Sequence, residues 1–231
     1  MLKISERLIE VASLVPKGCR LADVGTDHGY VPIWLLQNQY ITSAIAMDVN
    51  RGPLKRAEEN RDKYGFAEVM DIRLSDGLEK LRPGEADTVL IAGMGGPLMI
   101  RILEEGRANA AGASTWVLQP QSEIPSVRCY LIENGFDIVR EIMLKDEGKY
   151  YMAMQAVPGE AELWSDTEYL FGRFLLREKH PVLKEFILKE HRVYESIRKK
   201  LLETGQESGE RYKEVTEYLK ALEEAEEYYK R

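Results

Sequence analysis

Five strand-like apolar segments alternate with helix-like segments along the first 135 residues, and this alternation limits the fold more than any other feature of the chain. The strands are expected within residues 20–26, 43–50, 68–78, 86–96 and 114–121. The helices are expected within 5–15, around Pro32, and within 53–65, 97–106 and 124–135. This order predicts a mostly parallel sheet covered by helices on both faces.

Residues 136–157 break the pattern, because their apolar and polar positions alternate as in two paired strands joined by a turn at residues 146–148. A closing antiparallel hairpin is similar to the end of a class I methyltransferase sheet and unlike a dehydrogenase domain. We therefore expect an α/β, Rossmann-like class I methyltransferase domain over residues 1–158. Its sheet is expected to be seven-stranded and mostly parallel, with a terminal antiparallel hairpin.

After residue 158 the composition shifts to Glu, Lys, Arg, Leu and Tyr, and no strand signal remains. Two runs there show spacings of three and four residues: Leu183, Ile187, Glu190, Tyr194, Ile197 and Leu201, then Tyr212, Val215, Leu219, Leu222, Glu226 and Tyr229. The spacing predicts two helices that fold back as a short antiparallel coiled coil, forming a C-terminal helical domain over residues 159–231. The alternative is a helical cap on the sheet.

The charge of the chain is unevenly distributed. Its formal net charge of −7 argues against nonspecific nucleic-acid binding. Residues 173–200, however, hold nine Lys and Arg against four Glu, and the residues after 200 hold five against nine. This basic segment leaves a polyanionic partner open.

The sequence carries neither a targeting signal nor a metal-binding pattern. Charges interrupt the apolar positions of the first 18 residues, and no apolar run approaches the roughly 18 residues that span a bilayer. Cys19 and Cys129 lie far apart and outside any metal-spaced cluster, so we interpret them as buried thiols in a reducing compartment. We expect a soluble cytoplasmic protein with no membrane or metal partner.

Ligands of open parallel sheets bind at the carboxyl ends of the strands, so the first strand end is the first candidate site. Gly25 permits close backbone approach, whereas Asp27 would repel the pyrophosphate of a dinucleotide and suits a cationic or zwitterionic ligand. Asp23 accepts hydrogen bonds either from a ligand ammonium or from loop N–H groups. These acids favour an amino-acid-bearing cofactor such as S-adenosylmethionine over a nicotinamide dinucleotide.

The next strand ends add further candidates. Asp48 is suited to accept both hydroxyls of a ribose, while Asn50 fits the N-cap of the following helix. Residues 75–77 offer an acceptor for an exocyclic amine or form an ordinary turn. The glycine-rich stretch 93–96 either lets a transferred group approach the backbone or makes a tight turn before a helix. At the fifth strand end, the candidates for contacting an acceptor or capping the next helix are Gln119 and Gln121.

Together these residues resemble the bacterial tRNA (adenine(22)-N1)-methyltransferase family. The matching segments follow in order along the chain: "LADVGTDHGYVPIWLL", "AMDVNRGPL", "SDGL", "IAGMGG" and "LQPQ". The resemblance implies an S-adenosyl-L-methionine cofactor and a C-terminal helical domain that helps to hold tRNA. The cofactor site expected on this basis comprises Asp23, Gly25, Thr26, Asp27, His28, Gly29, Tyr30, Asp48, Val49, Asn50, Ser75, Asp76, Gly77, Gly93, Met94 and Gly95.

Asp27 and His28 are the expected catalytic residues. Methylation of adenine N1 yields a cation, so a carboxylate beside the methyl donor would stabilise the developing charge. His28 is expected to stack on a base or to order the loop, with Tyr30 as a further stacking platform and Trp34 more suited to the core. The fourth strand is not followed by the Asn-Pro-Pro-Tyr type of motif that amine-directed adenine methyltransferases use, which fits a ring-nitrogen acceptor.

The basic segment supplies the expected tRNA contacts, which are Arg173, Arg177, Lys184, Lys189, Arg192, Arg198, Lys199 and Lys200. We expect a monomer, with a dimer through the coiled coil as the alternative. Two other functions stay open from the residues alone. One is a small-molecule methyltransferase whose C-terminal helices serve dimerisation, and the other is a nonenzymatic RNA-binding adaptor with a vestigial cofactor pocket.

Overall fold

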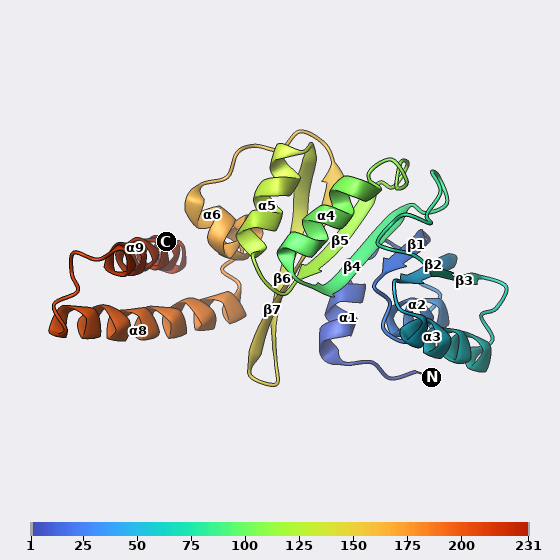
Figure 1. Ribbon diagram of the computed structural model, residues 1–231, viewed down its shortest axis with the longest axis horizontal. Helices are drawn as coiled ribbons and strands as arrows, with labels where there is room; N and C mark the ends of the chain where they lie inside the picture. Colours follow the sequence, from blue (N-terminus) through green and yellow to red (C-terminus); the bar gives the residue numbers. More distant parts are fainter. Residues whose placement is uncertain (1, 231) are drawn as a thin grey trace. The chain divides into compact units, whose positions relative to one another are not determined.

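The computed structural model describes residues 2–230, and the chain divides into two compact units between Glu162 and Leu163. The first unit contains a β-sheet with flanking helices, and the second is helical (Figure 1). The boundary expected from the sequence, after residue 158, coincides with the end of the last strand at Pro158. A short segment without regular structure follows that strand and completes the first unit.

The first unit is built on a single seven-stranded sheet with the strand order β3-β2-β1-β4-β5-β7-β6. Strands β1 to β5 are parallel, and β7 pairs antiparallel with both β5 and β6. The predicted mostly parallel sheet with a terminal hairpin is thus confirmed. The strands are β1 (Arg20–Val24), β2 (Ser43–Asp48), β3 (Met70–Leu74), β4 (Thr88–Met94), β5 (Thr115–Pro120), β6 (Phe136–Asp146) and β7 (Lys149–Pro158).

Five helices flank the sheet, with α4 and α5 on one side and α1, α2 and α3 on the other (Figure 1). They are α1 (Glu6–Ala12), α2 (Tyr30–Gln37), α3 (Arg51–Tyr64), α4 (Gly96–Gly106) and α5 (Ile124–Glu133). Ser5 caps α1, since its side chain accepts the Leu8 N–H at 3.4 Å. Helix α3 begins before Pro53, at Arg51, and ends at Tyr64, where Gly65 follows as the C-cap in the left-handed conformation.

The order of the strands places the ligand-binding edge between β1 and β4. The chain moves from β1 outward to β2 and β3, then returns to β4 and continues the other way to β5. The connections after β1 and β4 therefore leave the sheet on opposite faces, and a crevice opens at this switch point. The turn after β1 is held against β2, because the N–H groups of Gly25 and Thr26 both donate to the Met47 carbonyl at 2.8 and 2.9 Å.

A buried ion pair fastens α5 to the terminal hairpin. Arg128 on α5 and Glu141 on β6 have fully buried side chains and lie 2.8 Å apart. The Arg128 guanidinium also contacts the Met152 sulfur on β7 at 2.8 Å. The neighbouring Cys129 is only half-buried, which corrects the expectation of two buried thiols, whereas Cys19 is buried.

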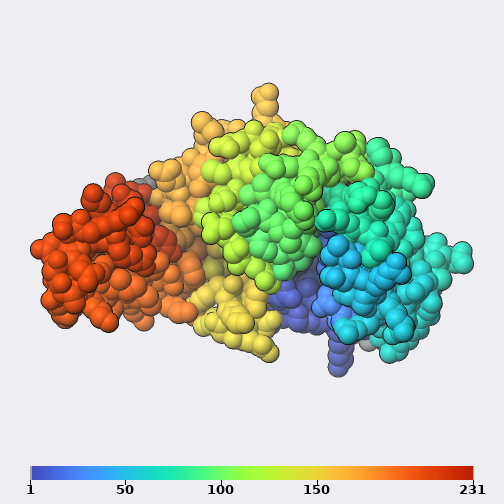
Figure 2. All heavy atoms as spheres, in the orientation of Figure 1, coloured from blue at the N-terminus to red at the C-terminus, as the bar shows by residue number. Residues whose placement is uncertain are grey.

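The second unit comprises α6 (Asp166–Phe171), α7 (Arg173–Arg177), α8 (Pro181–Glu203) and α9 (Glu210–Lys230). The two long helices are antiparallel, because the Tyr229 hydroxyl near the end of α9 donates to the His180 carbonyl just before α8 at 3.0 Å. Figure 1 shows a gap between the ribbons of α8 and α9, and Figure 2 shows side chains filling it. The predicted pair of C-terminal helices is therefore present.

The core of this unit involves more than the two long helices. Leu183, Ile187, Val215, Leu219 and Leu222 of the predicted spacing are buried. Positions near the connecting loop, Ile197 and Leu201 among them, are only half-buried. The short helices α6 and α7 pack against α9 and contribute buried Phe171, Leu175 and Leu176.

Candidate active site

A cleft of about 290 Å³ opens at the switch point where β1 and β4 end. Asp23, Gly25, Asp27 and Tyr30 line it from β1 and the turn into α2, and Gly93 lines it from β4. Five residues predicted from widely separated motifs thus share one cavity. Arg7 and Leu8 of α1, together with Gln121 after β5, complete the lining discussed below.

Two features of the backbone at position 25 require glycine: a positive φ and close packing against Met94. The φ of Gly25 is +73°, in the left-handed region that glycine enters readily. A Cβ at this position would also overlap the terminal methyl group of Met94. The turn after β1 and the end of β4 therefore pack directly on each other, and the Met94 side chain covers the turn.

Asp23 is a buried carboxylate at the base of the cleft, with 6% of its surface exposed. Burial is the main reason that the pKa of Asp23 is raised to about 6, and the nearby charges of Asp48 and Asp27 contribute to the increase. A cation bound in the cleft would offset both effects by favouring the ionised form. The site is thus suited to the ammonium of an amino acid.

Asp27, His28 and Tyr30 form a connected group in the turn into α2. The Nε2 atom of His28 lies 3.0 Å from an Asp27 carboxylate oxygen and 3.0 Å from the Arg56 guanidinium. Since one nitrogen cannot donate to Asp27 and accept from Arg56 at once, the position of the proton between the two ring nitrogens selects the partner. The His28 ring stacks on Tyr30 with centroids 5.0 Å apart.

The β2 end carries Asp48 and the exposed Val49 side by side. The Asp48 carboxylate accepts the Asn50 N–H at 2.6 Å, which fixes the turn and leaves further lone pairs available. Val49 is 60% exposed, so an apolar side chain lies beside an acceptor suited to a ribose. Asn50 occupies the N-cap position of α3, but its side chain makes no capping hydrogen bond.

The loop after β3 requires a correction. The buried Ser75 hydroxyl donates to the Gly77 carbonyl at 2.9 Å and accepts the Lys80 N–H at 3.1 Å. Its side chain therefore shapes the loop and is not placed to contact a ligand. Asp76 is half-exposed and pairs with Arg101 at 3.3 Å.

The other expected residues of the glycine turns take supporting positions. Thr26 is buried, and Gly29 precedes α2 with φ +67°. Gly95 lies at the N-cap of α4, where a Cβ would come within 3.2 Å of the Ser122 hydroxyl. These residues hold the two turns that border the cleft.

Gln119 differs from both roles considered for it. Its side chain is fully buried, so it neither reaches an acceptor at the surface nor caps α5. Its Oε1 accepts the Gly93 N–H at 3.1 Å and an Arg7 N–H at 3.0 Å. Gln119 thus joins the end of β4 to α1.

Arg7 is the charged residue of the cleft that the sequence analysis missed; the apolar lining residues Leu8, Val31 and Ala92 were not predicted either. Arg7 lies within an amphipathic opening helix and belongs to no recognisable motif. Besides its hydrogen bond to Gln119, its guanidinium lies over the Tyr151 ring of β7, 5.3 Å from the centroid. The only available signal was a cation in an otherwise apolar and acidic helix.

Comparisons with known proteins identify the family of this chain. Residues 4–154 match the family model described as a methyltransferase domain. A curated relative, the tRNA (adenine(22)-N(1))-methyltransferase of Bacillus subtilis, is 32% identical over 96% of this chain and 97% of its own length. The chain belongs to this methyltransferase family.

Solved structures agree with this membership. A putative tRNA (m1A22) methyltransferase from Streptococcus pneumoniae matches with a TM-score of 0.89 and 36% identity, covering 96% of this chain and 99% of that one. A second structure of that protein, solved in complex with S-adenosyl-L-methionine, matches with a TM-score of 0.87 and 35% identity. It covers 96% of this chain and 99% of that chain.

Not all the cations expected to bind tRNA in this methyltransferase are available. Arg173 is buried, donates to the Leu163 carbonyl at 2.7 Å and to Glu168 at 3.2 Å, and packs over the Trp164 ring. It stabilises the start of the helical unit, so its assignment to tRNA is corrected. Arg177 is half-exposed and pairs with the same Glu168 at 3.2 Å.

The remaining predicted cations lie on α8, where Lys184, Lys189, Arg192, Lys199 and Lys200 are exposed. At 3.6 residues per turn, Lys189, Arg192, Lys199 and Lys200 fall on the half of the helix opposite buried Leu183 and Ile187, and Lys184 lies at the edge between the two halves. Arg198 lies on the same side of the helix as Leu183 and Ile187, is half-buried, and forms two hydrogen bonds to Glu195, at 2.8 and 3.0 Å. We call the five exposed residues the basic face of α8.

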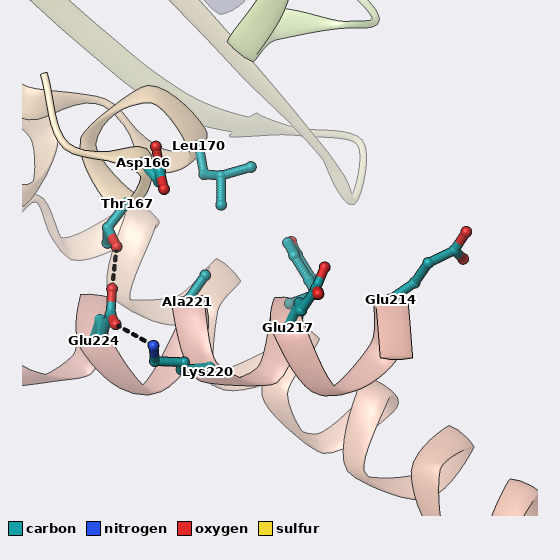
Figure 3. A pocket seen from close by; sticks show the side chains of 9 residues that line it. Asp166, Thr167, Leu170, Glu214, Glu217, Lys220, Ala221 and Glu224 are labelled. Carbon is teal, nitrogen blue, oxygen red and sulfur yellow. Dashed lines mark hydrogen bonds and ion pairs between the residues drawn. The ribbon is translucent and has the colours of Figure 1, made fainter. Parts of the chain in front are cut away.

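The hollow between α6 and α9 has the opposite charge. This groove of about 470 Å³ is lined by Asp166 of α6 and by Glu214, Glu217 and Glu224 of α9, with Lys220 as its cation (Figure 3). Glu224 accepts the Thr167 hydroxyl at 2.6 Å and lies 3.8 Å from Lys220. The groove is therefore unsuited to phosphates.

Two further observations concern the described residues 2–230. They contain no group of three or more His, Cys, Asp and Glu side chains arranged to hold a metal ion. None of their helices is both long enough and apolar enough to cross a membrane.

Proposed function

We propose that this chain transfers the methyl group of S-adenosyl-L-methionine to N1 of adenine 22 in tRNA. The observation that carries the proposal is the cleft in which Asp23 and Asp27 meet the glycine turns after β1 and β4. The buried carboxylate of Asp23 and the exposed carboxylate of Asp27 both line the cleft. Two negative charges there favour binding of a cationic amino-acid group and disfavour a pyrophosphate. The family membership described above supports tRNA as the acceptor.

Each part of the cofactor has a plausible contact on this chain. Asp23 and Asp27 would hold the ammonium, and Asp48 would accept the ribose hydroxyls, with exposed Val49 against the adenosine. Asp76 and the Gly77 backbone would contact the adenine. Gly93 would border the methyl group, with Met94 and Gly95 shaping the turn beside it.

For this methyl transfer the protein must align the methyl donor with adenine N1 and stabilise the positive charge that develops on the adenine. When bound, the cofactor supplies an activated methyl group that leaves its sulfur as a neutral thioether and gives the adenine a positive charge. We assign the stabilisation of that charge to Asp27, which lines the cleft. Tyr30 presents a ring to the same cleft for the adenine to stack on, and the stacked His28 supports it.

Incubation of the protein with labelled S-adenosyl-L-methionine and unmodified tRNA tests the function directly. We expect N1-methyladenosine after nucleoside analysis, and none when adenine 22 is replaced by guanine. Cofactor binding without label in tRNA would favour a small-molecule acceptor. Absence of cofactor binding would favour an RNA-binding adaptor.

The affinity for S-adenosyl-L-methionine should depend on pH through Asp23. Because the pKa of Asp23 is raised to about 6, the carboxyl is ionised at pH 7.5 and mostly protonated at pH 5. Only the ionised form pairs with an ammonium, so Kd should rise about tenfold per pH unit below 6. Isothermal titration calorimetry from pH 5 to 8, with proton release measured in two buffers, checks this.

Asp23→Asn is the control for that profile. It should weaken binding at pH 7.5 and remove the pH dependence. The folded-state pKa of Asp23 is raised, so its ionisation destabilises the ligand-free protein as the pH rises through 6. The variant should accordingly melt at or above the wild-type temperature at pH 7.5. A pH profile that survives the substitution would assign the titration to another group.

We also propose that α8 and α9 form a short antiparallel coiled coil that presents the basic face of α8 to tRNA phosphates. Leu183 and Ile187 of α8 are buried within one chain, together with Leu219 and Leu222 of α9. No second copy is needed to cover them, which supports a monomer in solution. We also propose a cytoplasmic location, which a tRNA substrate supports.

Reversing charge on the basic face should weaken tRNA binding. For a variant with Lys184, Arg192 and Lys199 changed to Glu, we expect at least a tenfold higher Kd at low salt. The slope of log K against log salt should become shallower by about 2 to 3, since each lost phosphate contact removes roughly 0.7–0.9. Filter binding at several salt concentrations measures both.

The matched control reverses three cations of α9, Arg211, Lys213 and Lys220, and should leave tRNA affinity within about threefold. S-adenosyl-L-methionine affinity should be unchanged in both variants. Equal losses of tRNA affinity in the two would show a general charge effect and remove the basic face from the proposal.

A further inference from the structure

The two walls of the cleft carry opposite charge. Asp23 and Asp27 lie on the side of β1 and its turn, whereas Arg7 approaches from α1. A ligand that bridges these walls needs a cationic group and an anionic group on the same small unit. An α-amino acid in its zwitterionic form meets this requirement.

Arg7 is held in a fixed position by two unrelated contacts. One of its N–H groups donates to Gln119 Oε1 at 3.0 Å, and its guanidinium lies over the Tyr151 ring, 5.3 Å from the centroid. Neither contact neutralises its charge. A guanidinium carries further N–H donors in a planar fork that matches a carboxylate, and the Gln119 bond occupies only one of them.

The orientation of the Gln119 amide is determined by its neighbours. Its oxygen faces two donors, the Gly93 N–H and Arg7, so a flipped amide would place donor against donor. The Nε2 atom is consequently directed away from them, and this buried donor has no hydrogen-bond partner among the described residues. The Gln119 amide is thus fixed with its oxygen toward Arg7, which holds the Arg7 guanidinium at the cleft.

We propose that Arg7 binds the carboxylate of the cofactor's amino-acid group and that Gln119 is the positioning residue that holds Arg7 for this contact. The inference rests on the proposed function, because it presupposes an S-adenosyl amino acid in the cleft. It assigns the ammonium to the acidic wall and the carboxylate to the α1 wall. Gly93 at the end of β4 lines the same cleft and would border the rest of the cofactor.

A ligand pair that differs only in the carboxylate tests the proposal. S-adenosylhomocysteine and its decarboxylated analogue, S-adenosyl-3-thiopropylamine, are titrated calorimetrically into the wild type and into Arg7→Met. The substitution should raise Kd for S-adenosylhomocysteine about 30- to 100-fold and change that for the analogue less than about threefold. Arg7→Lys should recover part of the affinity for S-adenosylhomocysteine alone, since an ammonium keeps the charge without the fork.

Two further variants separate positioning from folding. Gln119→Glu keeps a hydrogen-bond acceptor for Arg7 but adds a negative charge near the expected position of the ligand carboxylate. It should therefore lower the affinity for S-adenosylhomocysteine more than the affinity for the decarboxylated analogue. Arg140→Met is the matched control, because Arg140 also anchors α1, through the Ser13 carbonyl at 3.3 Å, and lies outside the cleft lining. It should leave both Kd values unchanged.

The outcomes distinguish the inference from the function on which it rests. If Arg7→Met lowered the affinity for both ligands equally, the proposed contact between Arg7 and the ligand carboxylate would be overturned. Unchanged affinity for both, with a raised KM for tRNA, would overturn it too and assign Arg7 to RNA. Failure of the wild type to bind either ligand would instead contradict the proposed function.

Discussion

Asp27→Asn is expected to lower kcat for tRNA methylation about 100-fold, the magnitude typical of removing one group that stabilises transition-state charge. The carboxylate is exposed in the free protein, but a docked adenine would exclude water from it and strengthen its field. Asparagine preserves the size of the side chain and removes the charge. Single-turnover kinetics with saturating cofactor and tRNA measures the chemical step alone.

The cofactor affinity of this variant should fall less than about tenfold, because Asp23 remains to hold the ammonium. Asp62→Asn is the control, since Asp62 is an exposed carboxylate of α3 that pairs with its neighbour Arg61 outside the cleft. It should leave kcat unchanged. An Asp27→Asn enzyme with wild-type kcat would remove Asp27 from catalysis, and a loss confined to cofactor Kd would limit it to binding.

Glu141→Ala is expected to destabilise the methyltransferase unit by about 3–5 kcal/mol, the usual cost of leaving a buried charge without its partner. Arg128 and Glu141 are both fully buried, so neither charge is compensated by water after the other is removed. The melting temperature of a unit of this size should fall by roughly 2–4 °C per kcal/mol. Denaturant unfolding and calorimetry at pH 7 measure the change.

The double variant Arg128→Met with Glu141→Leu should recover most of this loss, since apolar replacements of similar volume remove the desolvation cost of both ions. Glu79→Ala, which breaks the exposed Glu79–Lys80 pair, should change stability by less than about 0.5 kcal/mol. If Glu141→Ala unfolded no more easily than Glu79→Ala, the pair would not be what joins α5 to the hairpin.

Much of the fold followed from local patterns. Apolar strands bounded by turn residues fix the sheet, because a parallel strand buried on both faces must be almost wholly apolar. The carboxyl ends of β1 and β4 could be located for the same reason, and with them Asp23, Asp27 and Gly93. Ser5 and Gly65 marked helix ends through their own side-chain and backbone chemistry.

The residue roles that the sequence predicted wrongly or missed depend on contacts between distant segments. Arg173 has the same composition signal as Lys184, yet a nearby Trp164 and Glu168 bury it. Ser75 and Gln119 looked like ligand contacts until the groups around them proved to use their hydrogen bonds. Arg7 reaches the cleft only because α1 packs beside the terminal hairpin, a pairing that no local pattern reports.

The packing of Arg7 on Tyr151 has a consequence for the newly synthesised chain. One wall of the cleft comes from the first helix and is held by the last strand, which lie at opposite ends of the catalytic unit in the order of translation. A ribosome-bound chain therefore has every motif of the β1 to β4 turns before it has a complete pocket. Chains that terminate before β7 is made would lack the Tyr151 contact that holds Arg7 at the cleft.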